Sequence, residues 1–244
     1  MRFNLPPSKL LKMKESMQDY HRAVIMLARY PGSEEIAEWA VSYHPQCAHL
    51  LQDNFRNNPS VMGIVLEQSP LSAIRLADGA VRSNKAFMMK AVAIDGSLLA
   101  YASPSLLADF DLVECAIRNC PSALQYADYD VRDHAPWFYK MVGENGLLLE
   151  YATSGVRTTR RVVLRACQQN GMALLFAPQY DRGDREIVNA ALAQTVHACQ
   201  FASKPYQGTP EFIVYVHTMC QEQGVDPRTI APYLNPAYSL DLLS

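Results

Sequence analysis

"LLAYASPSLLADFDLVECAI" (residues 98–117) and "ALLFAPQYDRGDREIVNAAL" (residues 173–192) carry the same pattern of side chains, 75 residues apart. Each has an apolar block that ends in an aromatic residue and alanine, a short polar segment with an acidic residue, and a second apolar run. Aligned on the pair before the polar segment, the pattern recurs every 25 residues without insertion or deletion. A fixed period of about 20 to 50 residues indicates a repeat array. The pairs are Leu76-Ala77, Tyr101-Ala102, Tyr126-Ala127, Tyr151-Ala152, Phe176-Ala177 and Phe201-Ala202.

The second apolar run predicts an amphipathic helix in each repeat. Leu112, Val113 and Ala116 follow an i, i+1, i+4 spacing, which marks one face of a helix. A glycine or proline then ends the helix, and the aromatic–alanine block forms a second short helix. Side chains that can cap the first helix occupy one column: Asn84, Asp109, Thr159, Asp184 and Thr209. A second capping column predicts a brief helical turn between repeats: Asp78, Ser103, Asp128, Thr153 and Ser203.

These columns predict an all-α fold, a curved α-solenoid of about seven helix-turn-helix units of 25 residues with capping helices at both ends. One unit cannot bury its apolar faces alone, so neighbouring units must stack. Residues 1–32 are expected to form an N-terminal capping helix, with a long amphipathic stretch from about Ser8 to Arg29. Residues 33–208 form the repeat array and 209–244 the C-terminal cap, in a single continuous domain.

Composition limits the classes of function. Hydrophobic residues make up 49% of the 244 and charged residues 19%, as in ordinary soluble proteins. The net charge of −2 disfavours nucleic acid or an anionic membrane as a partner. The chain has no stretch typical of a signal peptide or a transmembrane span, so we expect a cytoplasmic location, or transfer into a host cell without a cleaved signal.

The repeats resemble a known family. "NKAFMMKAVAIDGSLLAYASPSLLADFDLVECAI" and "RRVVLRACQQNGMALLFAPQYDRGDREIVNAAL" are similar to tandem helical repeats of unknown function, whose consensus runs roughly D-R-E-V-V-x-x-A-V-x-x-N-G-x-A-L-x-Y-A. A family unit of about 49 residues spans two of the periods described above. The resemblance implies an all-helical repeat protein of the kind found in protist proteins and in secreted effectors of intracellular bacteria. It supplies no catalytic residues.

Arginine recurs two residues before the helix cap, at Arg82, Arg132, Arg157 and Arg182, and Leu107 interrupts the series. If exposed, the four guanidinium groups form a ladder along one edge that could bind an acidic partner. Alternatively, each arginine pairs with a nearby aspartate at Asp109, Asp133 or Asp184, an exposed pairing of about 0–1 kcal/mol.

Further arginines gather around the sixth repeat. Phosphate or nucleic acid could bind such a cluster, but it lacks interleaved exposed aromatic residues and the net charge is −2. We therefore do not expect a nucleic-acid partner. The cluster comprises Arg157, Arg160, Arg161, Arg165, Arg182 and Arg185.

"HAPWFYKMV" (residues 134–142) places three aromatic residues in a row. Trp137 and Phe138 fall in core columns. Tyr139 lies one position further round the helix, in a column that also holds Trp39 and Met89. This column is either semi-buried between repeats or lines a binding groove, where exposed aromatic side chains are favoured anchors.

The His and Cys residues show no ligand pairs at a standard metal spacing. His44, Cys47 and His49 are close in sequence, as are His197 with Cys199 and His217 with Cys220, but structural roles explain them. The six cysteines are scattered without a CxxC pair, which predicts buried reduced thiols. We expect no metal, no cofactor and no catalytic residue.

The sequence thus favours a non-enzymatic scaffold for protein–protein interaction, in a bacterial effector or effector-regulating system. The partner-binding candidates are the four column arginines with Tyr139, Trp39 and Met89. The alternative is an enzyme, a transferase or hydrolase, with a pocket where the repeat array meets a cap. The partner's identity and the oligomeric state are not encoded in any recognisable pattern.

Overall fold

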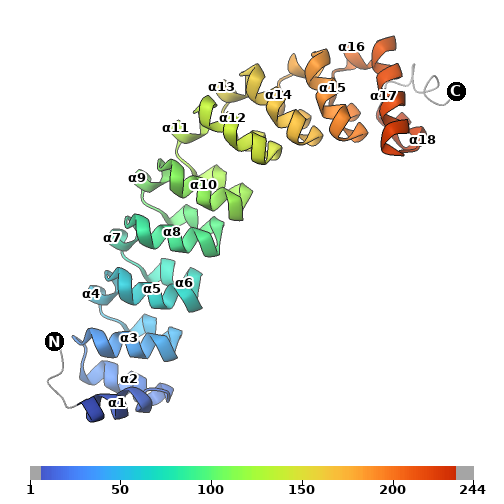
Figure 1. Cartoon of the computed structure of the whole chain (residues 1–244). Coiled ribbons are helices and arrows are strands. Elements are labelled where there is room, and N and C mark those ends of the chain that lie inside the picture. The colour runs from blue at the N-terminus through green and yellow to red at the C-terminus, as the bar shows by residue number, and fades with distance from the viewer. Residues whose placement is uncertain (1–6, 235–244) are drawn as a thin grey trace. The chain divides into compact units, whose positions relative to one another are not determined.

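The computed structural model describes residues 7–234, of which 79% are helical and none lies in a β-strand (Figure 1). This confirms the all-α class. In the same residues no helix combines the length and apolar character needed to cross a membrane. The contacts divide the chain into two compact units, unit 1 ending at Asp128 and unit 2 beginning at Tyr129.

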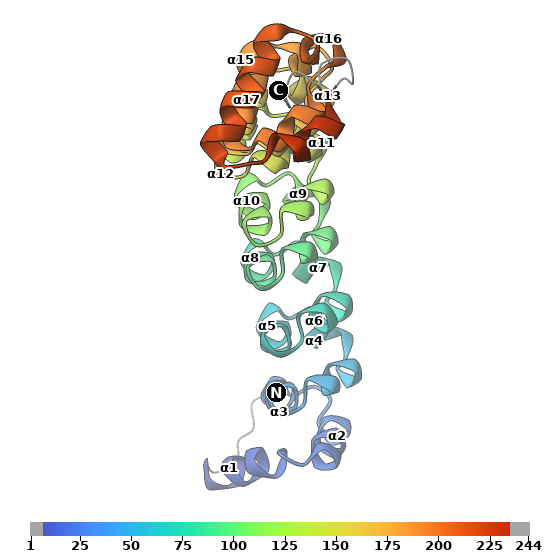
Figure 2. The ribbon, with the colours of Figure 1, turned by 90° about the vertical axis from the view of Figure 1, so that its right-hand side faces the viewer.

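Unit 1 repeats a three-part pattern of a long helix, a 3₁₀ helix and a short helix. Figure 2 shows α5, α8 and α10 in one row and α4, α7 and α9 in a second row beside it. The long helices are α3 (Glu34–Tyr43), α5 (Pro59–Gln68), α8 (Lys85–Ile94) and α10 (Phe110–Asn119). The 3₁₀ helices are η1 (Pro45–Leu50), η2 (Gly96–Tyr101) and η3 (Pro121–Tyr126), with α6 (Pro70–Leu76) α-helical at the equivalent place. The short helices are α4 (Asp53–Arg56), α7 (Gly79–Arg82) and α9 (Pro104–Leu107).

Unit 2 continues the same pattern, and its long helices begin at intervals of 25 residues. They are α12 (Ala135–Glu144), α14 (Arg160–Gln169), α15 (Arg185–Gln194) and α17 (Pro210–Gln223). The 3₁₀ helices are η4 (Gly146–Tyr151), η5 (Gly171–Phe176) and η7 (Val196–Phe201). The short elements are α11 (Tyr129–Arg132), α13 (Ser154–Arg157), η6 (Asp181–Gly183) and α16 (Lys204–Gln207).

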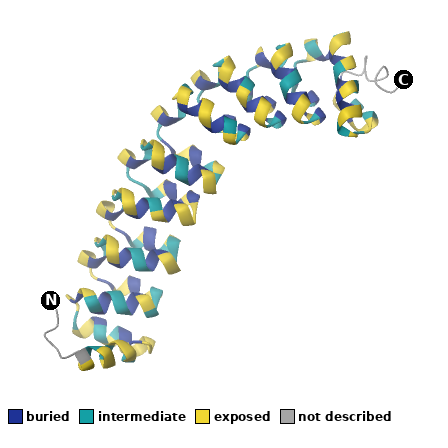
Figure 3. Cartoon of the chain, viewed as in Figure 1, coloured by how far each residue is buried: buried dark blue, intermediate teal, exposed yellow. Residues whose placement is uncertain are grey.

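Within each unit, a long helix packs against the next long helix and against its own 3₁₀ helix. In α10 the apolar pair Leu112 and Val113 is fully buried together with Ala116. In α14, Val162 and Val163 are buried in the same way. Figure 3 shows the buried residues on the faces between neighbouring helices and the exposed residues on the outer faces. The predicted apolar columns therefore form the core.

The second helix of most repeats is a 3₁₀ helix rather than an ordinary α-helix. Its first and fourth residues are both buried in η4 and in η7, at Gly146 with Leu149 and at Val196 with Cys199. The backbone N–H of Ala127 donates to the carbonyl oxygen of Leu124 at 3.1 Å, which is the i to i+3 bond of this helix type. A six-residue segment with a three-residue apolar repeat favours this tighter winding.

Most of the predicted caps hold the long helices in place. Asn84 and Asp109 each accept a hydrogen bond at 3.0 Å from the backbone N–H three residues ahead. Asp184 and Thr209 cap α15 and α17 in the same manner. Thr159 was predicted to cap α14, but its hydroxyl donates to the carbonyl oxygen of Gly155 at 3.3 Å instead.

Glycine at the end of a long helix lets the next repeat approach closely. A Cβ at Gly96 would lie 2.2 Å from the carbonyl oxygen of Ala116, and one at Gly146 would lie 2.4 Å from that of Ala166. Gly171 has the same relation to Ala191, at 2.2 Å. No side chain fits at these distances. At these three junctions the glycine therefore permits the close approach of the next repeat.

A side-chain amide closes the junctions at Gly96 and Gly146, and another closes the equivalent junction at Val196. Asn119, the last residue of α10, accepts from the N–H of Gly96 at 2.9 Å and donates to the carbonyl oxygen of Ala93 at 3.2 Å. Gln169, at the end of α14, accepts from Gly146 at 2.6 Å. Gln223 makes the equivalent bond to Val196 at 2.8 Å. The amide thus satisfies backbone groups left unpaired where the preceding helix ends.

The N-terminal cap differs from the prediction of one helix over Ser8–Arg29. The chain forms two helices, α1 (Pro7–Ser16) and α2 (Tyr20–Arg29). Asp19 breaks the helix because its carboxylate accepts from the N–H of Arg22 at 2.9 Å and starts α2.

At the other end α17 stops at Gly224, in the left-handed conformation with φ 64°, and α18 (Pro227–Ile230) and η8 (Ala231–Tyr233) follow. The remainder of the predicted C-terminal cap, residues 235–244, lies outside the described residues, and the domain boundaries stay a prediction.

Gly146→Ala should lower the free energy of unfolding by about 1–3 kcal/mol, because the added methyl group forces α14 away from η4. The matched control is Gly63→Ala in α5, where a Cβ would meet nothing within 4 Å. The control should stabilise the chain by up to about 1 kcal/mol through helix propensity. Urea unfolding followed by circular dichroism measures both. Equal effects of the two substitutions would contradict the close approach.

Candidate functional site

The four column arginines lie at or near the ends of the short helices. Arg82, Arg132 and Arg157 are the last residues of α7, α11 and α13, and Arg182 lies inside η6. All four are half-buried, whereas the sequence interpretation expected exposed side chains. Other residues at the same position are Arg56 in α4, Leu107 in α9 and Gln207 in α16.

In this column Arg157 and Gln207 bind backbone carbonyl groups at the ends of 3₁₀ helices, whereas Arg182 donates to the side-chain oxygen of Gln179 at 2.9 Å. Nε of Arg157 donates to the carbonyl oxygen of Ala152 at 3.0 Å. The fully buried Gln207 donates from Nε2 to Ala202 at 3.1 Å and to Cys199 at 2.9 Å. The final carbonyl groups of a helix lack partners within it, so these side chains supply the missing donors. Arg157 therefore has a structural role.

The aspartates that the sequence suggested as arginine partners bind other groups. Asp109 accepts from Lys85 of the preceding long helix at 2.7 Å. Asp184 accepts from Arg160, again on the preceding long helix, at 3.1 Å. Asp133 accepts from the hydroxyl of Thr153. Two of these contacts are ion pairs that tie successive long helices together.

Arg157 also borders a surface depression. The depression lies between α13 and the end of η5, and Leu175 and Phe176 provide its apolar part. Leu175 is 47% exposed. A contribution of Arg157 to partner binding therefore stays a prediction beside its structural role.

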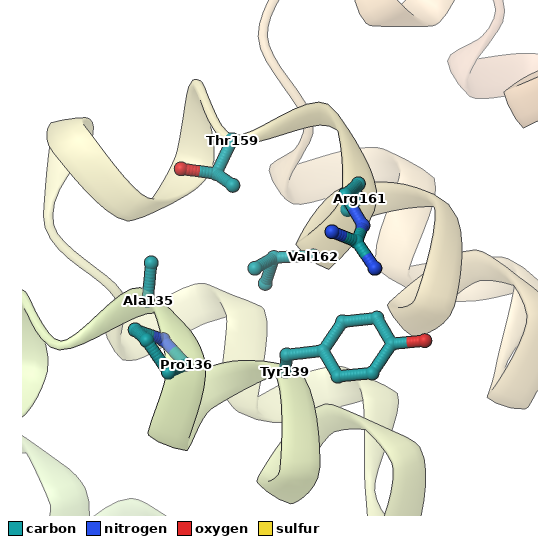
Figure 4. Close-up of a pocket in the computed structure, with 6 residues that line it drawn as sticks. All are labelled: Ala135, Pro136, Tyr139, Thr159, Arg161 and Val162. Carbon is teal, nitrogen blue, oxygen red and sulfur yellow. The ribbon is translucent and has the colours of Figure 1, made fainter.

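Tyr139 lines a depression between the first turns of α12 and α14, shown in Figure 4. Its side chain is 42% exposed, which places it on the surface rather than in the core. The guanidinium carbon of Arg161 lies 5.8 Å from the centre of the Tyr139 ring, within the range of a cation–π interaction. The other lining residues are Ala135, Pro136, Thr159 and Val162. An aromatic ring, an arginine and an apolar floor thus meet at one place.

A second arginine extends the same surface by one turn. A Cβ at Gly143 would lie 3.0 Å from Nε of Arg165, so the side chain of Arg165 covers this glycine. Arg161 and Arg165 of α14 therefore lean over Tyr139 and Gly143 of α12. Both arginines are exposed, and among residues 7–234 neither has an ion-pair partner. Their charges therefore face solvent.

Trp39 lies on α3 and Met89 on α8, both in unit 1, and both are half-buried. Tyr139 belongs to unit 2. The structure thus places all three candidates on the partly exposed side of a long helix. A groove that runs through all three remains a prediction.

His44 and Cys199 have structural surroundings. His44 lies with Nε2 3.2 Å from the carbonyl oxygen of Met17 and 3.1 Å from that of Gln18, which ties α3 to the break between α1 and α2. Burial raises the pKa of the Cys199 thiol to about 12, whereas a nucleophilic cysteine needs a lowered pKa. Between residues 7 and 234 no three His, Cys, Asp or Glu side chains gather closely enough to hold a metal ion.

Asp181 occupies a core position that sequence analysis missed. The equivalent residues in earlier repeats are aliphatic and buried: Val81, Leu106, Val131 and Val156. Asp181 is only 1% exposed, and its Oδ2 has no hydrogen-bond partner among the described residues. Burial raises its pKa, the charge of Asp184 raises it further, and Arg160 partly opposes both. Aligning this column by the 25-residue period would have revealed the exception.

The fold and these surfaces define an all-helical repeat protein with solvent-facing patches between its long helices. The chain is similar to the family described as "Domain of unknown function (DUF4116)" over residues 84–132, 139–181 and 159–207. Two of the matched segments begin at Asn84 and Thr159, the residues that precede α8 and α14, so the family unit follows the observed repeat. No curated protein and no solved structure matches the chain.

Arg157→Ala should lower the free energy of unfolding by about 1–2 kcal/mol, because the carbonyl group of Ala152 loses its donor and the buried stem its packing. Arg75→Ala, on the exposed side of α6, is the matched control and should change it by less than about 0.5 kcal/mol. Urea unfolding provides the comparison. If both variants unfold like the unaltered chain, Arg157 is a surface residue only.

Asp181→Val should stabilise the chain by about 1–2 kcal/mol at pH 7, because it restores the aliphatic column and removes an unpartnered buried carboxylate. Since the pKa of Asp181 is raised on folding, the folded state holds the proton more tightly than the unfolded state. The protonated carboxyl group of Asp181 stabilises the folded chain fully at pH values below its pKa in the unfolded chain. This stabilisation is lost as the pH rises through its pKa in the folded chain. The advantage of the variant should therefore grow from pH 4 to pH 7 in thermal melts, and a constant difference would contradict the assignment.

Proposed function

We propose that this chain is an α-solenoid of about seven 25-residue units that acts as a non-enzymatic scaffold for protein–protein interaction. Within each unit, long helices pack on long helices and 3₁₀ helices on 3₁₀ helices of the next repeat. Stacking of this kind produces extended surfaces rather than one deep pocket, and repeat proteins use such surfaces to bind partners.

The observation that carries the proposal is the exposed Tyr139 with Arg161 across its ring. Tyrosine and arginine are enriched among the residues that contribute most to protein interfaces, where they pack against a partner and lose water together. Here both project from neighbouring long helices into one depression. The side chains are supported from below by the buried Val162.

The enzyme alternative placed a pocket where the repeat array meets a cap. A depression does lie there, between α15 and α17. Its Asn189 is already engaged, since Tyr206 donates to the side-chain oxygen at 3.4 Å. Its Val214 is 66% exposed. A fixed amide beside an exposed aliphatic side chain suits a contact surface, and we assign this depression to binding.

The resemblance to repeats of bacterial effectors suggests the setting. We propose that the scaffold works in a cytoplasm, of its own cell or of a host, as an effector or as a regulator of one. A host or effector protein is then the first class of partner to examine.

Affinity capture from cell extract tests the function. The variant Tyr139→Ala with Arg161→Ala should retain less than a tenth of the proteins captured by the unaltered chain, as identified by mass spectrometry, because the central anchor is gone. The matched control, Tyr126→Ala with Arg75→Ala, also removes one exposed tyrosine and one exposed arginine. It should retain its captured proteins. Equal capture by all three chains would contradict the proposed surface.

A further inference from the structure

Unit 2 carries a second depression at the same helix positions as the first. The first lies between α12 and α14, and the second between α15 and α17. Ala135 and Tyr139 of the first correspond to Arg185 and Asn189 of the second, 50 residues or two repeats later. Both depressions therefore open on the same side of the row of long helices.

The second depression is apolar at its centre and fixed at its floor. Val214 is 66% exposed and lies beside Pro210. The hydroxyl of Tyr206 donates to Oδ1 of Asn189 at 3.4 Å, and that of Tyr215 to its backbone oxygen at 3.5 Å. An apolar side chain of a partner could cover Val214 without displacing a polar group.

The charge between the two depressions is positive. Arg160 spans from α14 to α15, where it contacts Asp184 at 3.1 Å and Glu186 at 2.6 Å. Arg160 offsets one of the two carboxylate charges at the start of α15. Arg161, Arg165 and Arg185 have no ion-pair partner among the described residues, and these three charges outnumber the two negative charges that remain, one from Asp184 with Glu186 and one from Glu211 at the second depression. The surface is complementary to an acidic partner.

The spacing of the depressions matches an extended chain. Neighbouring long helices lie about 10 Å apart, so two repeats separate the depressions by roughly 20 Å. An extended segment advances about 3.3 Å per residue and covers this distance in about six residues. Because alternate side chains of an extended segment point to the same side, residues i and i+6 would both face the protein, as would i+2 and i+4.

We propose that the face of α12, α14, α15 and α17 binds an extended acidic segment of a protein partner. A large apolar side chain fills each depression, and carboxylates at the intermediate inward positions contact Arg161, Arg165 and Arg185. This inference rests on the proposed binding function and specifies its partner chemistry.

Selection from a display library of random linear 12-residue peptides, with the full chain as target, tests the segment. Enriched peptides should be acidic and should carry two large apolar residues about six positions apart. In fluorescence anisotropy, moving the second apolar residue to three positions from the first should weaken binding at least tenfold. Enrichment of neutral or basic peptides would overturn the proposal. So would an affinity that does not depend on the spacing of the two apolar residues.

Variants locate the binding surface. Arg161→Glu with Arg165→Glu should weaken a selected peptide at least tenfold, and so should Val214→Asp. The matched control is Arg22→Glu with Arg75→Glu, two exposed arginines of unit 1, which should leave the affinity within twofold. Circular dichroism melts confirm that each variant is folded. Peptides that bind all variants equally would place the site elsewhere and overturn the inference.

The two proposals fail in different ways. If no linear peptide enriches while protein capture still depends on Tyr139 and Arg161, the extended acidic segment is wrong and the binding function stands. If peptides do not enrich and capture is also independent of these residues, both proposals fall.

Discussion

A close contact between a glycine and the carbonyl oxygen of the following repeat sets the spacing of the repeats at three junctions of this chain. At Gly96, Gly146 and Gly171 the next long helix lies so near that a Cβ would stand 2.2 to 2.4 Å from its backbone. This separation allows the amides of Asn119 and Gln169 to reach back and join one helix end to the next. A wider spacing would leave these backbone groups without protein partners.

Several polar side chains that the sequence interpretation placed at the surface instead bind groups of the same chain at the junctions between repeats. Arg157 and Gln207 complete the ends of 3₁₀ helices, and Asp109 and Asp184 anchor neighbouring long helices. The exposed charges without an ion-pair partner in the described part of unit 2 include those of Arg161 and Arg165 on α14 and of Arg185 at the start of α15. An arginine that completes a helix end can thus be told from one that stays on the surface by the backbone group it contacts.

Much of the fold could be predicted from the sequence because the same apolar and capping positions recur in every repeat. The buried pairs such as Leu112 and Val113, and the caps Asn84 and Asp109, all lie where the columns placed them. The 3₁₀ winding was missed because short apolar segments do not distinguish three residues per turn from 3.6. The helix break at Asp19 was missed because one capping bond there outweighs a continuous amphipathic pattern.

The candidate site was harder to predict, since the direction of a long side chain depends on acceptors that only the folded backbone creates. Leu107 could have indicated that the arginine column is not fully exposed, because an aliphatic residue in that column favours a half-buried position. The exposure of Tyr139 could be inferred from its column, but its pairing with Arg161 depends on the packing of α12 against α14.

The junctions between repeats also bear on how the chain folds. Their side-chain hydrogen bonds join residues about one repeat apart in sequence, from 20 residues at Thr153 and Asp133 to 31 at Gln223 and Leu192. Closing such short loops costs little entropy, and a low contact order accompanies rapid folding. A growing polypeptide can therefore acquire native structure one repeat behind its point of synthesis, and a lineage can gain or lose a repeat without disturbing distant parts of the molecule.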